Sequence, residues 1–358
     1  MRLLLVTPLY PPEPGGPSTY AKLIEDGLPS RGITIDTLKF RDVRHLPKLL
    51  RHIAFFFKVL KRGKRADVIL VQDTVSCGLP ATLAAGILGK RLVVRVPGDY
   101  AWEQGRQRFG VREDLDAFQG TRARWQVRVL RTIQRFVVRQ ANLVLVPSEY
   151  FAGIVGQWGV KAARLKVIYH GVETADVTAP TNRPNTKLIV TVGRLVPWKG
   201  FAELIQLLPE LPEWSLAIVG DGPDRARLER VARECNVSDR VLFTGGLPRR
   251  EALGWLSIAD AFVLNSSFES FSFQVAEALS LGSAIIATSA GSIPELVSDG
   301  PEGVLVPPGD AQALLAAIKS VMDEPERWKG RRAAAHAKAA RFSTATMLDR
   351  TAEAFMSV

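Results

Sequence analysis

The sequence is poor in cysteine. Among its 358 residues only Cys77 and Cys235 are cysteines, and no Cys-x-x-Cys pair or cluster of cysteine with histidine occurs. Disulfide-rich secreted domains and structural zinc sites depend on such clusters. We therefore expect a reducing compartment and no structural metal, with both cysteines serving as core residues.

Long apolar runs are missing as well. No segment approaches the roughly 18 uninterrupted apolar residues of a membrane-spanning helix, and the first residues, MRLLLVTPLYPPEPGG, have proline and glycine where a signal peptide would continue. We expect a cytoplasmic chain that neither crosses a membrane nor enters the secretory route. Its composition, 47% hydrophobic and 23% charged, is that of an ordinary globular protein long enough for two domains.

Acidic residues are scarce in one half of the chain only. Residues 1–175 contain 28 Lys and Arg against 14 Asp and Glu, a net charge of +14, whereas residues 176–358 contain 19 against 22, a net charge of −3. This asymmetry indicates an acidic partner for the first half, with nucleic acid and anionic lipid as the two candidates.

The order of predicted elements defines the fold class. Short apolar runs alternate with helical patterns in two series: RLLLVTP, TIDTLKF, ADVILVQ, RLVVRVP and ANLVLVP, and then LIVTVG, SLAIVG, RVLFTG, AFVLN, AIIAT and GVLVP. Helices are predicted at Thr19–Leu28, around Tyr150–Trp158 and in ATLAAGILG. This alternation predicts two consecutive open α/β domains with parallel sheets covered on both faces.

The junction between the two domains is predicted from composition. Residues 173–185 carry Pro, Thr, Asn and Asp without apolar periodicity. We therefore expect domains at residues 1–174 and 185–340. The last segment, residues 341–358, has Met347, Thr351, Ala354 and Phe355 at helical spacing, which predicts a C-terminal helix.

The stretch ESFSFQVAE places Glu269 before a predicted helix and Glu277 inside it, with Ser270 or Ser272 as the helix cap. A phosphate over the helix start would gain from its free N–H groups. Carboxylates repel phosphate, so the two acids suit hydroxyl groups on either side of it. The simpler alternative is a helix cap and a surface ion pair.

Two further loops end strands of the second series. TVGRLVPWKG places Arg194 and Lys199 where open α/β sheets bind ligands, and cations at this spacing suit a diphosphate. AIIATSAGSIPEL places Glu295 after another strand. Solvated loop charges are the alternative for the two cations.

Two sequence patterns look like a cofactor motif and a metal motif, but each lacks a feature that the motif requires. VGDGPDR lacks the third glycine of a dinucleotide fingerprint, and no acidic residue ends the next strand, so we interpret it as a tight turn. Asp114-Leu115-Asp116 is a formal Asp-x-Asp, but no strand precedes it. We expect no metal site there.

Taken together, the chain resembles the retaining nucleotide-sugar glycosyltransferases of the GT-B fold, glycosyltransferase family four. GRLVPWKG, VGDGP, RVLFTGG, ESFSFQVAE, EALSLGSAIIATSAGSIPEL and GVLVPPGD follow the family's order, and YPPEPGGPSTY and VIYHGVE resemble motifs of its first domain. The resemblance implies two Rossmann-like domains facing each other across a cleft, an acceptor-side domain followed by a donor-binding domain, and a C-terminal helix that crosses back to the first.

The resemblance also implies roles for individual residues. Arg194 and Lys199 would bind the diphosphate of a UDP- or GDP-sugar, Glu277 the ribose, and Glu269 the transferred sugar. Gly16 would let the backbone approach the donor, and the backbone N–H groups of Ser270, Phe271, Ser272 and Phe273 would orient the sugar. The family's mechanism needs no protein nucleophile and no metal, because the leaving diphosphate assists the attack.

One departure concerns the first domain. Where many family members have a histidine near the donor sugar, this chain reads PGDYAWE. Asp99 is the nearest group that could accept a sugar hydroxyl, and Tyr100, Trp102 and Glu103 could complete the pocket; an Asp in an ordinary turn is the alternative. His170 stands where the family more often has Asn, and we interpret it as a hinge residue.

Two basic segments suggest a partner. HLPKLLRHIAFFFKVLKRGKR is a basic amphipathic helix of the kind that lies in the headgroup region of anionic membranes. A second cationic stripe, from Arg124 to Arg139, lies opposite Trp125, Val129, Ile133 and Phe136. The alternative is two core helices with solvated outer faces. Peripheral binding at the inner membrane face would suit a lipid-linked or growing polysaccharide acceptor.

Two other functions remain open. A nucleotide-sugar epimerase or hydrolase of the same fold would share the phosphate site but lack a sugar acceptor. A nucleic-acid-binding protein would explain the charge, but it predicts aromatic residues interleaved with the basic groups. The carboxylates of the predicted site favour a hydroxyl-rich ligand and hence sugar transfer.

Overall fold

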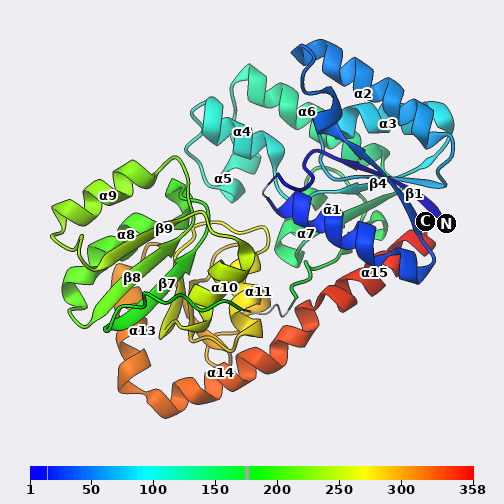
Figure 1. Ribbon diagram of the computed structural model, residues 1–358. Coiled ribbons are helices and arrows are strands. Elements are labelled where there is room, and N and C mark those ends of the chain that lie inside the picture. Colours follow the sequence, from blue (N-terminus) through cyan, green and yellow to red (C-terminus); the bar gives the residue numbers. More distant parts are fainter. Residues whose placement is uncertain (14, 174–176) are drawn as a thin grey trace. The chain divides into compact units, whose positions relative to one another are not determined.

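The computed structural model describes residues 1–13, 15–173 and 177–358 (Figure 1). The chain forms two compact units: unit 1 contains Met1–Gly171 and Thr344–Val358, and unit 2 contains Val172–Ser343. The predicted junction at residues 173–185 includes residues 174–176, which lie outside the described residues.

Unit 1 is built on a six-stranded parallel sheet with the order β2-β1-β3-β4-β5-β6. Its strands are β1 (Arg2–Thr7), β2 (Thr34–Lys39), β3 (Val68–Val71), β4 (Arg91–Arg95), β5 (Leu143–Val146) and β6 (Leu165–Val167). The four interior strands β1, β3, β4 and β5 are buried almost throughout, because helices cover both faces.

The helices of unit 1 pack on opposite faces of this sheet. On one face, α1 (Gly16–Gly27) and α15 (Thr344–Met356) share a core with Leu3, Leu5 and Leu70. On the other face, α2 (Lys48–Gly63) lies so close that a Cβ at Gly63 would approach the Leu4, Ile69 and Leu88 side chains. The remaining helices are α3 (Gly78–Leu88), α4 (Tyr100–Arg108), α5 (Leu115–Gly120), α6 (Trp125–Gln140) and α7 (Glu149–Gly156).

Unit 2 has a second six-stranded parallel sheet, with the order β12-β11-β10-β7-β8-β9. The strands are β7 (Lys187–Val192), β8 (Trp214–Val219), β9 (Val241–Gly245), β10 (Ala261–Leu264), β11 (Ile285–Thr288) and β12 (Gly303–Val306). One face packs on α8 (Phe201–Leu207), α9 (Arg225–Glu234), α13 (Ala311–Asp323) and α14 (Pro325–Ala339). The unit also contains α10 (Arg249–Ser257), α11 (Phe273–Ser280) and α12 (Ile293–Leu296).

The predicted fold class is confirmed: all eleven predicted strands are present in two parallel α/β sheets. The C-terminal helix is confirmed too, since α15 belongs to unit 1, where Leu348 packs against Gly27 of α1. The sequence reasoning missed β6, a three-residue edge strand that is only half-buried. Helix α1 begins three residues before the predicted Thr19.

No helix among the described residues is long and apolar enough to cross a membrane.

Candidate active site

The strand order of unit 2 marks where a ligand would bind. Starting from β7, the chain adds β8 and β9 on one side and β10, β11 and β12 on the other, so the order reverses between β7 and β10. In open α/β sheets, ligands bind at the carboxyl ends of the strands beside such a reversal. The loops there are residues 193–200, after β7, and residues 265–272, after β10.

These two loops lie directly against each other. Gly200 has a φ of +67°, and a Cβ there would stand 2.1 Å from the Asn265 carbonyl oxygen. The Asn265 Nδ2 donates a hydrogen bond to the Gly200 carbonyl at 3.1 Å. The Ser267 N–H donates to the Trp198 carbonyl at 2.8 Å. Only glycine fits at position 200, and the contact fixes the two loops together.

A third loop holds the backbone of Glu269. The Ser292 N–H donates a hydrogen bond to the Glu269 carbonyl at 3.0 Å. Gly291, with a φ of +57°, is packed so that a Cβ there would stand 2.3 Å from the same carbonyl oxygen. The loops after β7, β10 and β11 therefore meet around Glu269. Glu295 lies just beyond, on the short helix α12.

The centre of this loop cluster is an ion pair. The Lys199 Nζ lies 2.5 Å from Glu269 Oε1, and the two side chains are only 12% and 9% exposed. A lysine ammonium has three donors, so two remain to bind a phosphate while the third holds the carboxylate. The structure thus brings together two residues that lie 70 positions apart in the sequence.

Arg194 lies in the same loop and is exposed. Its side chain has no hydrogen-bond or ion-pair partner among the described residues. The loop around it is held by the turn after β8: a Cβ at Gly220 would stand 2.0 Å from the Gly193 oxygen, and one at Gly222 would stand 2.4 Å from the Leu195 oxygen. This backbone packing accounts for both glycines of VGDGPDR without a dinucleotide.

Glu277 lies in the helix that follows Glu269. The structure selects Ser272 as the cap of α11, because its Oγ accepts the Val275 N–H. Glu277 is the fifth residue of this helix, about 6 Å along the axis from its first residue. No acidic side chain occupies the first turn of α11, so the partial positive charge of the helix start is not neutralised locally.

Sequence reasoning missed the partner of Glu277. Arg249 Nε donates to Glu277 Oε1 at 2.9 Å, and Arg249 Nη2 donates to the Glu173 carbonyl at 3.1 Å. Burial raises the pKa of Glu277, and Arg249 opposes this increase. A signal was present: Arg249 is the first residue of α10, where a cation meets the positive end of the helix dipole and needs an acid nearby.

The residues between the two acids have different surroundings. Phe271 is buried and makes edge-to-face contacts with Phe273 and Phe342 at centroid distances of 5.6 and 6.2 Å. Its side chain therefore anchors the loop. Ser270 is half-buried. The predicted role of the backbone N–H groups of residues 270–273 stays a prediction.

Asp99 acts as a helix cap in unit 1. Its side chain is 1% exposed and accepts hydrogen bonds from the Trp102 N–H at 3.0 Å, Gln134 Nε2 at 3.1 Å and Gln119 Nε2 at 2.9 Å. These contacts match the alternative of a structural Asp at a turn. The prediction that Asp99 accepts a sugar hydroxyl is not tested by them, and neither are the pocket roles of Tyr100 and Glu103.

Gly16 and His170 occupy the carboxyl edge of the unit 1 sheet. Gly16 begins α1 after Gly15, which has a φ of +135° and no side chain to cap the helix. His170 is buried, and its Nε2 lies 2.7 Å from Arg95 Nη2. Burial and then Arg95 hold the pKa of His170 well below its ordinary value. The histidine is therefore a neutral acceptor for a buried cation.

The Asp-x-Asp segment is used structurally. Asp114 caps α5 by accepting the Ala117 N–H, and Asp116 accepts a hydrogen bond from the Tyr150 hydroxyl at 3.1 Å. Across residues 1–13, 15–173 and 177–358, no three His, Cys, Asp or Glu side chains gather in a way that could hold a metal ion.

Comparisons with known proteins cover nearly the whole chain. A family model described as "Glycosyl transferase 4-like domain" matches residues 2–171, and one described as "Glycosyl transferases group 1" matches residues 174–341.

Individual relatives agree with these matches. The GDP-mannose-dependent alpha-(1-6)-phosphatidylinositol monomannoside mannosyltransferase of Mycolicibacterium smegmatis is 28% identical over 91% of this chain and 90% of its own length. The lipopolysaccharide core biosynthesis glycosyltransferase LpsD of Rhizobium meliloti is 37% identical over 43% of each chain. The crystal structure of Anabaena HepE in complex with UDP-glucose superposes with a TM-score of 0.80, at 21% identity and full coverage of both chains.

Proposed function

Because the chain belongs to the group 1 glycosyltransferases, a family of retaining nucleotide-sugar enzymes with the GT-B fold, we propose that the loop cluster of unit 2 is its donor site. The observation that carries this proposal is the buried Lys199–Glu269 pair at the strand reversal. The substrate would be a nucleoside diphosphate sugar, from which the enzyme moves the sugar to an acceptor hydroxyl with retention of configuration.

The diphosphate is assigned to two cations and one helix start. Lys199 has two donors free of Glu269, Arg194 is exposed and has no side-chain partner within the part of the chain that the structure describes, and α11 begins beside the same loop. These groups oppose the charge that grows on the departing phosphate, in a site partly shielded from water. The retaining reaction then needs neither a metal nor a protein nucleophile, since the leaving diphosphate accepts the acceptor's proton.

The two acids are assigned to the hydroxyl groups at either end of the donor. Glu269 would contact the transferred sugar, with its backbone fixed by Ser292 and Gly291. Glu277 would accept the ribose hydroxyls. Burial raises the pKa of Glu277, and the hydrogen bond and charge of Arg249 oppose that rise and so favour the ionised, accepting form.

The donor and acceptor themselves are proposed from the relatives. By their names, the mannosyltransferase depends on GDP-mannose and acts on phosphatidylinositol monomannoside, and LpsD acts in lipopolysaccharide core biosynthesis; the HepE structure holds UDP-glucose. We infer a UDP- or GDP-hexose as donor and a lipid-linked or saccharide acceptor in glycolipid or surface polysaccharide assembly. The enzyme would act in the cytoplasm, with unit 1 on the acceptor side and Gly16 letting the backbone of unit 1 approach the donor.

Two alternatives make distinct predictions. An epimerase or hydrolase with the same donor site would convert or cleave the nucleotide sugar without any acceptor. A nucleic-acid-binding protein would gain no stability from nucleotide sugars. The acids at the centre of the loop cluster disfavour a polyphosphate chain as ligand.

The test is a panel of nucleoside diphosphate sugars, including UDP-glucose and GDP-mannose, read as shifts in the melting temperature of the whole protein. Donor binding stabilises the native state by an amount that grows with the ratio of ligand concentration to Kd. We expect one donor to raise Tm, and Glu277→Gln to reduce that shift by weakening the ribose contact. A panel without any shift would refute the donor site.

Glu269→Ala distinguishes transfer from simple binding. We expect this variant to fold, to keep part of its donor-induced shift and to lose transfer of the sugar. Met322→Gln, a substitution of an exposed residue on α13, is the control and should leave both properties unchanged. Full turnover by the Glu269→Ala variant would remove Glu269 from the site.

A further inference from the structure

Exposed apolar side chains gather on one part of unit 1. Among the described residues, twelve large hydrophobic side chains are exposed, and nine of them lie on α2, α3 and α6. We call these nine residues the α2–α3–α6 face: Leu49, Leu50, Ile53, Phe57, Leu83, Ile87, Trp125, Val129 and Phe136. An exposed apolar patch of this kind marks a surface that binds something.

Helix α2 shows that the patch is not the outer side of an ordinary core helix. The helix is amphipathic, and its buried residues are Phe55, Val59 and Gly63. Its wider apolar stripe points outward, with Leu49 81% exposed and Phe57 60% exposed. The exposed side of α2 is therefore largely apolar, which a core helix with a solvated outer face does not require.

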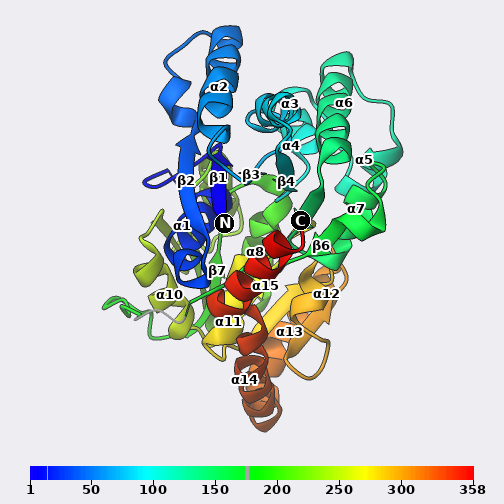
Figure 2. The ribbon, with the colours of Figure 1, turned by 90° about the vertical axis from the view of Figure 1, so that its right-hand side faces the viewer.

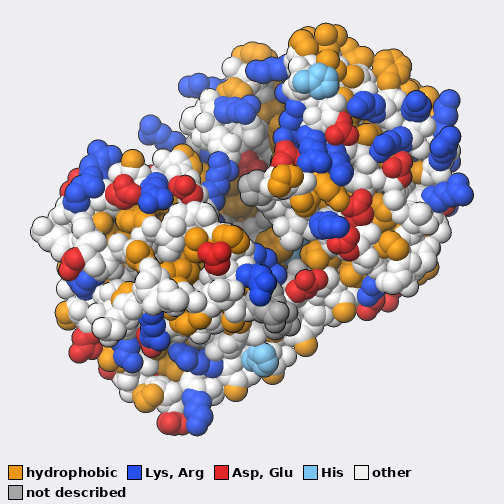
Figure 3. All heavy atoms as spheres, viewed as in Figure 1, with side chains coloured by type: hydrophobic (Ala, Val, Ile, Leu, Met, Phe, Trp, Pro, Cys, Tyr) orange, Lys and Arg blue, Asp and Glu red, His pale blue; other side chains and the backbone are white. Residues whose placement is uncertain are grey.

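The other two helices continue the patch. α3 contacts both α2 and α6, and Figure 2 shows the three helices beside one another on unit 1. Trp125, at the start of α6, is 70% exposed, and Ile87 on α3 is 69% exposed. In Figure 3 hydrophobic side chains cover α2, with Lys and Arg side chains beside them.

An apolar groove runs between α2 and α3. It has a volume of about 360 Å³ and is lined by His52, Ile53, Phe56, Phe57, Leu79, Pro80 and Leu83. His52 is the one residue of this lining with an ionisable side chain, and its Nδ1 is engaged by the Ser76 carbonyl at 3.2 Å. The groove therefore suits a hydrocarbon chain and offers almost nothing to a polar ligand.

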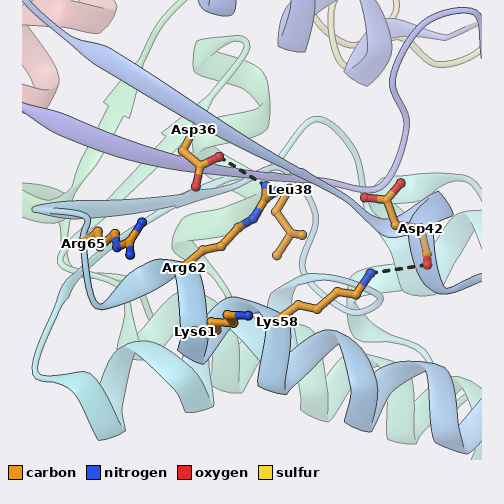
Figure 4. A pocket seen from close by; sticks show the side chains of 7 residues that line it. All are labelled: Asp36, Leu38, Asp42, Lys58, Lys61, Arg62 and Arg65. Carbon is orange, nitrogen blue, oxygen red and sulfur yellow. Dashed lines mark hydrogen bonds and ion pairs between the residues drawn. The ribbon is translucent and has the colours of Figure 1, made fainter.

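The flank of α2 away from this groove is cationic. A second hollow, of about 490 Å³, is lined by Asp36, Leu38, Asp42, Lys58, Lys61, Arg62 and Arg65 (Figure 4). Arg62 points to Asp36 at 3.2 Å, and Lys58 points to the Asp42 backbone oxygen at 3.5 Å. The side chains of Lys61 and Arg65 have no partner among the described residues, so the flank keeps an excess of positive charge.

From these observations we propose that the α2–α3–α6 face docks on an anionic phospholipid bilayer. The apolar side chains enter the boundary between headgroups and acyl chains, the groove takes a hydrocarbon chain, and Lys58, Lys61 and Arg65 meet lipid phosphates. Charge complementarity selects this occupant: hydrophobic residues at the outermost positions with cations on the flank are the arrangement of interfacial helices. The docking deepens the proposed function, since it would bring unit 1 to a lipid-linked acceptor.

The experiment is co-sedimentation of the full chain with vesicles. Phosphatidylcholine vesicles with about one third phosphatidylglycerol are compared with vesicles of phosphatidylcholine alone. We expect binding to the anionic vesicles that weakens as salt rises from about 0.1 M to 1 M, since screening shortens the reach of the cations. Failure to bind anionic vesicles at either salt concentration would overturn the proposal.

Two triple variants separate the apolar and the cationic contributions. Leu49→Gln with Ile53→Gln and Phe57→Gln should weaken partitioning at least about 10-fold. Lys58→Gln with Lys61→Gln and Arg65→Gln should weaken it on the order of 100-fold on anionic vesicles. The matched controls are Met322→Gln and the triple Lys161→Gln, Lys319→Gln and Lys329→Gln, all at exposed positions off the face, which should change partitioning less than 2-fold.

Other readouts assign the face to a different occupant. A concentration-dependent dimer in analytical ultracentrifugation that the Leu49 triple variant abolishes would assign it to a second copy and overturn the proposal. Equal binding to neutral vesicles would also overturn it. The donor-induced Tm shift is measured on the same variants, so that the two proposals can fail separately. If vesicle binding is lost and the Tm shift is kept, the result bears on docking alone. If vesicles are bound and no donor shifts Tm, the result bears on the donor site alone.

Discussion

The two units share an architecture and differ in how their ligand edges are built. Both have six parallel strands, but in unit 1 the order reverses between β1 and β3, and in unit 2 between β7 and β10. In unit 2 the loops at this reversal are locked to one another through Gly200, Gly220 and Gly291, each against another loop's backbone. In unit 1 the loop after β1 ends at Gly15, where a Cβ would meet nothing closer than the Leu9 side chain at 3.4 Å.

Under the proposed function, this difference would distinguish a donor edge whose loops are locked together from an acceptor edge whose loop after β1 has no such lock at Gly15. A site that holds one charged ligand in a defined orientation benefits from loops that cannot move independently. An edge that receives larger and more variable groups does not need such locks. The charge follows the same division, since the first half of the chain carries a net charge of +14 and the second half −3.

The buried cations of the two edges differ as well. In unit 2, Lys199 is paired with Glu269. In unit 1, Arg95 is 3% exposed, lies 3.7 Å from the Tyr20 ring centroid and contacts His170, with no carboxylate partner among the described residues. Burial lowers the pKa of Arg95 to about 10. One cation depends on a charged partner, and the other is tolerated without one.

The largest expected effect on the free energy of unfolding comes from removing the buried cation of each unit in turn. Lys199→Met leaves the Glu269 carboxylate buried and unpaired, which should lower the free energy of unfolding by about 3–5 kcal/mol. Arg95→Met leaves no charge behind and should change it by about 1 kcal/mol or less. Urea unfolding of both variants at neutral pH measures the difference. Equal losses for the two variants would contradict the distinction.

The double variant separates stability from function. Lys199→Met with Glu269→Gln removes both charges and should recover most of the lost stability, while the donor-induced Tm shift stays lost. Recovery of both would mean that the pair is structural and that the donor binds elsewhere.

A smaller effect should follow from unlocking the loop cluster. Gly291→Ala would place a methyl group 2.3 Å from the Glu269 carbonyl, whereas Gly309→Ala meets no atom within 4 Å, and both positions have a positive φ, +57° and +83°. The left-handed conformation costs each variant about 1 kcal/mol, and the clash adds about 1–3 kcal/mol to Gly291→Ala alone.

The donor-induced Tm shift is the second measurement on this pair of glycine variants. Only Gly291→Ala should reduce the shift, because only that substitution displaces Glu269. If both variants or neither variant changed the Tm shift, the packing of Gly291 against Glu269 would not matter for donor binding.

These glycines also show what sequence can predict. The apolar runs place all but one of the strands, because a strand buried on both faces must be apolar throughout. The loops that end β7, β10 and β11 could be assigned to one edge for the same reason, since parallel strands share their carboxyl ends. The ion pair between Lys199 and Glu269 could not be predicted, because it depends on distances across 70 residues of chain.

Asp99 and Arg249 show what residue type and position leave open. Asp99 is predicted to accept a sugar hydroxyl because it stands where many family members have a histidine; in the structure three donors surround it and it caps α4, and the sugar contact stays a prediction. No role is predicted for Arg249 from the sequence, because its partner Glu277 lies 28 residues away on another helix. Residue type and strand position point to an edge of the sheet, and the hydrogen-bond partners decide what each side chain does there.

The smallest expected effect concerns the buried cluster of unit 1. Burial and the neighbouring Arg95 hold the pKa of His170 well below its ordinary 6.5, so the folded state keeps it neutral while the unfolded chain binds a proton as pH falls. Stability from this group is therefore complete above about pH 6.5 and is lost below it. Between pH 7.5 and 5.5 the loss should be about 1.4 kcal/mol.

His170→Asn isolates this contribution, because an amide oxygen can still accept from Arg95 but does not titrate in this range. The other groups that titrate between these pH values, His52 among them, remain in both proteins and cancel in the difference. Urea midpoints at the two pH values should fall less for the Asn variant than for the parent protein. If the urea midpoints of the two proteins fall equally with pH, His170 takes up its proton in the folded state as readily as in the unfolded chain. Arg95 would then lie beside a charged histidine in acid, and its contrast with the paired Lys199 would no longer hold there.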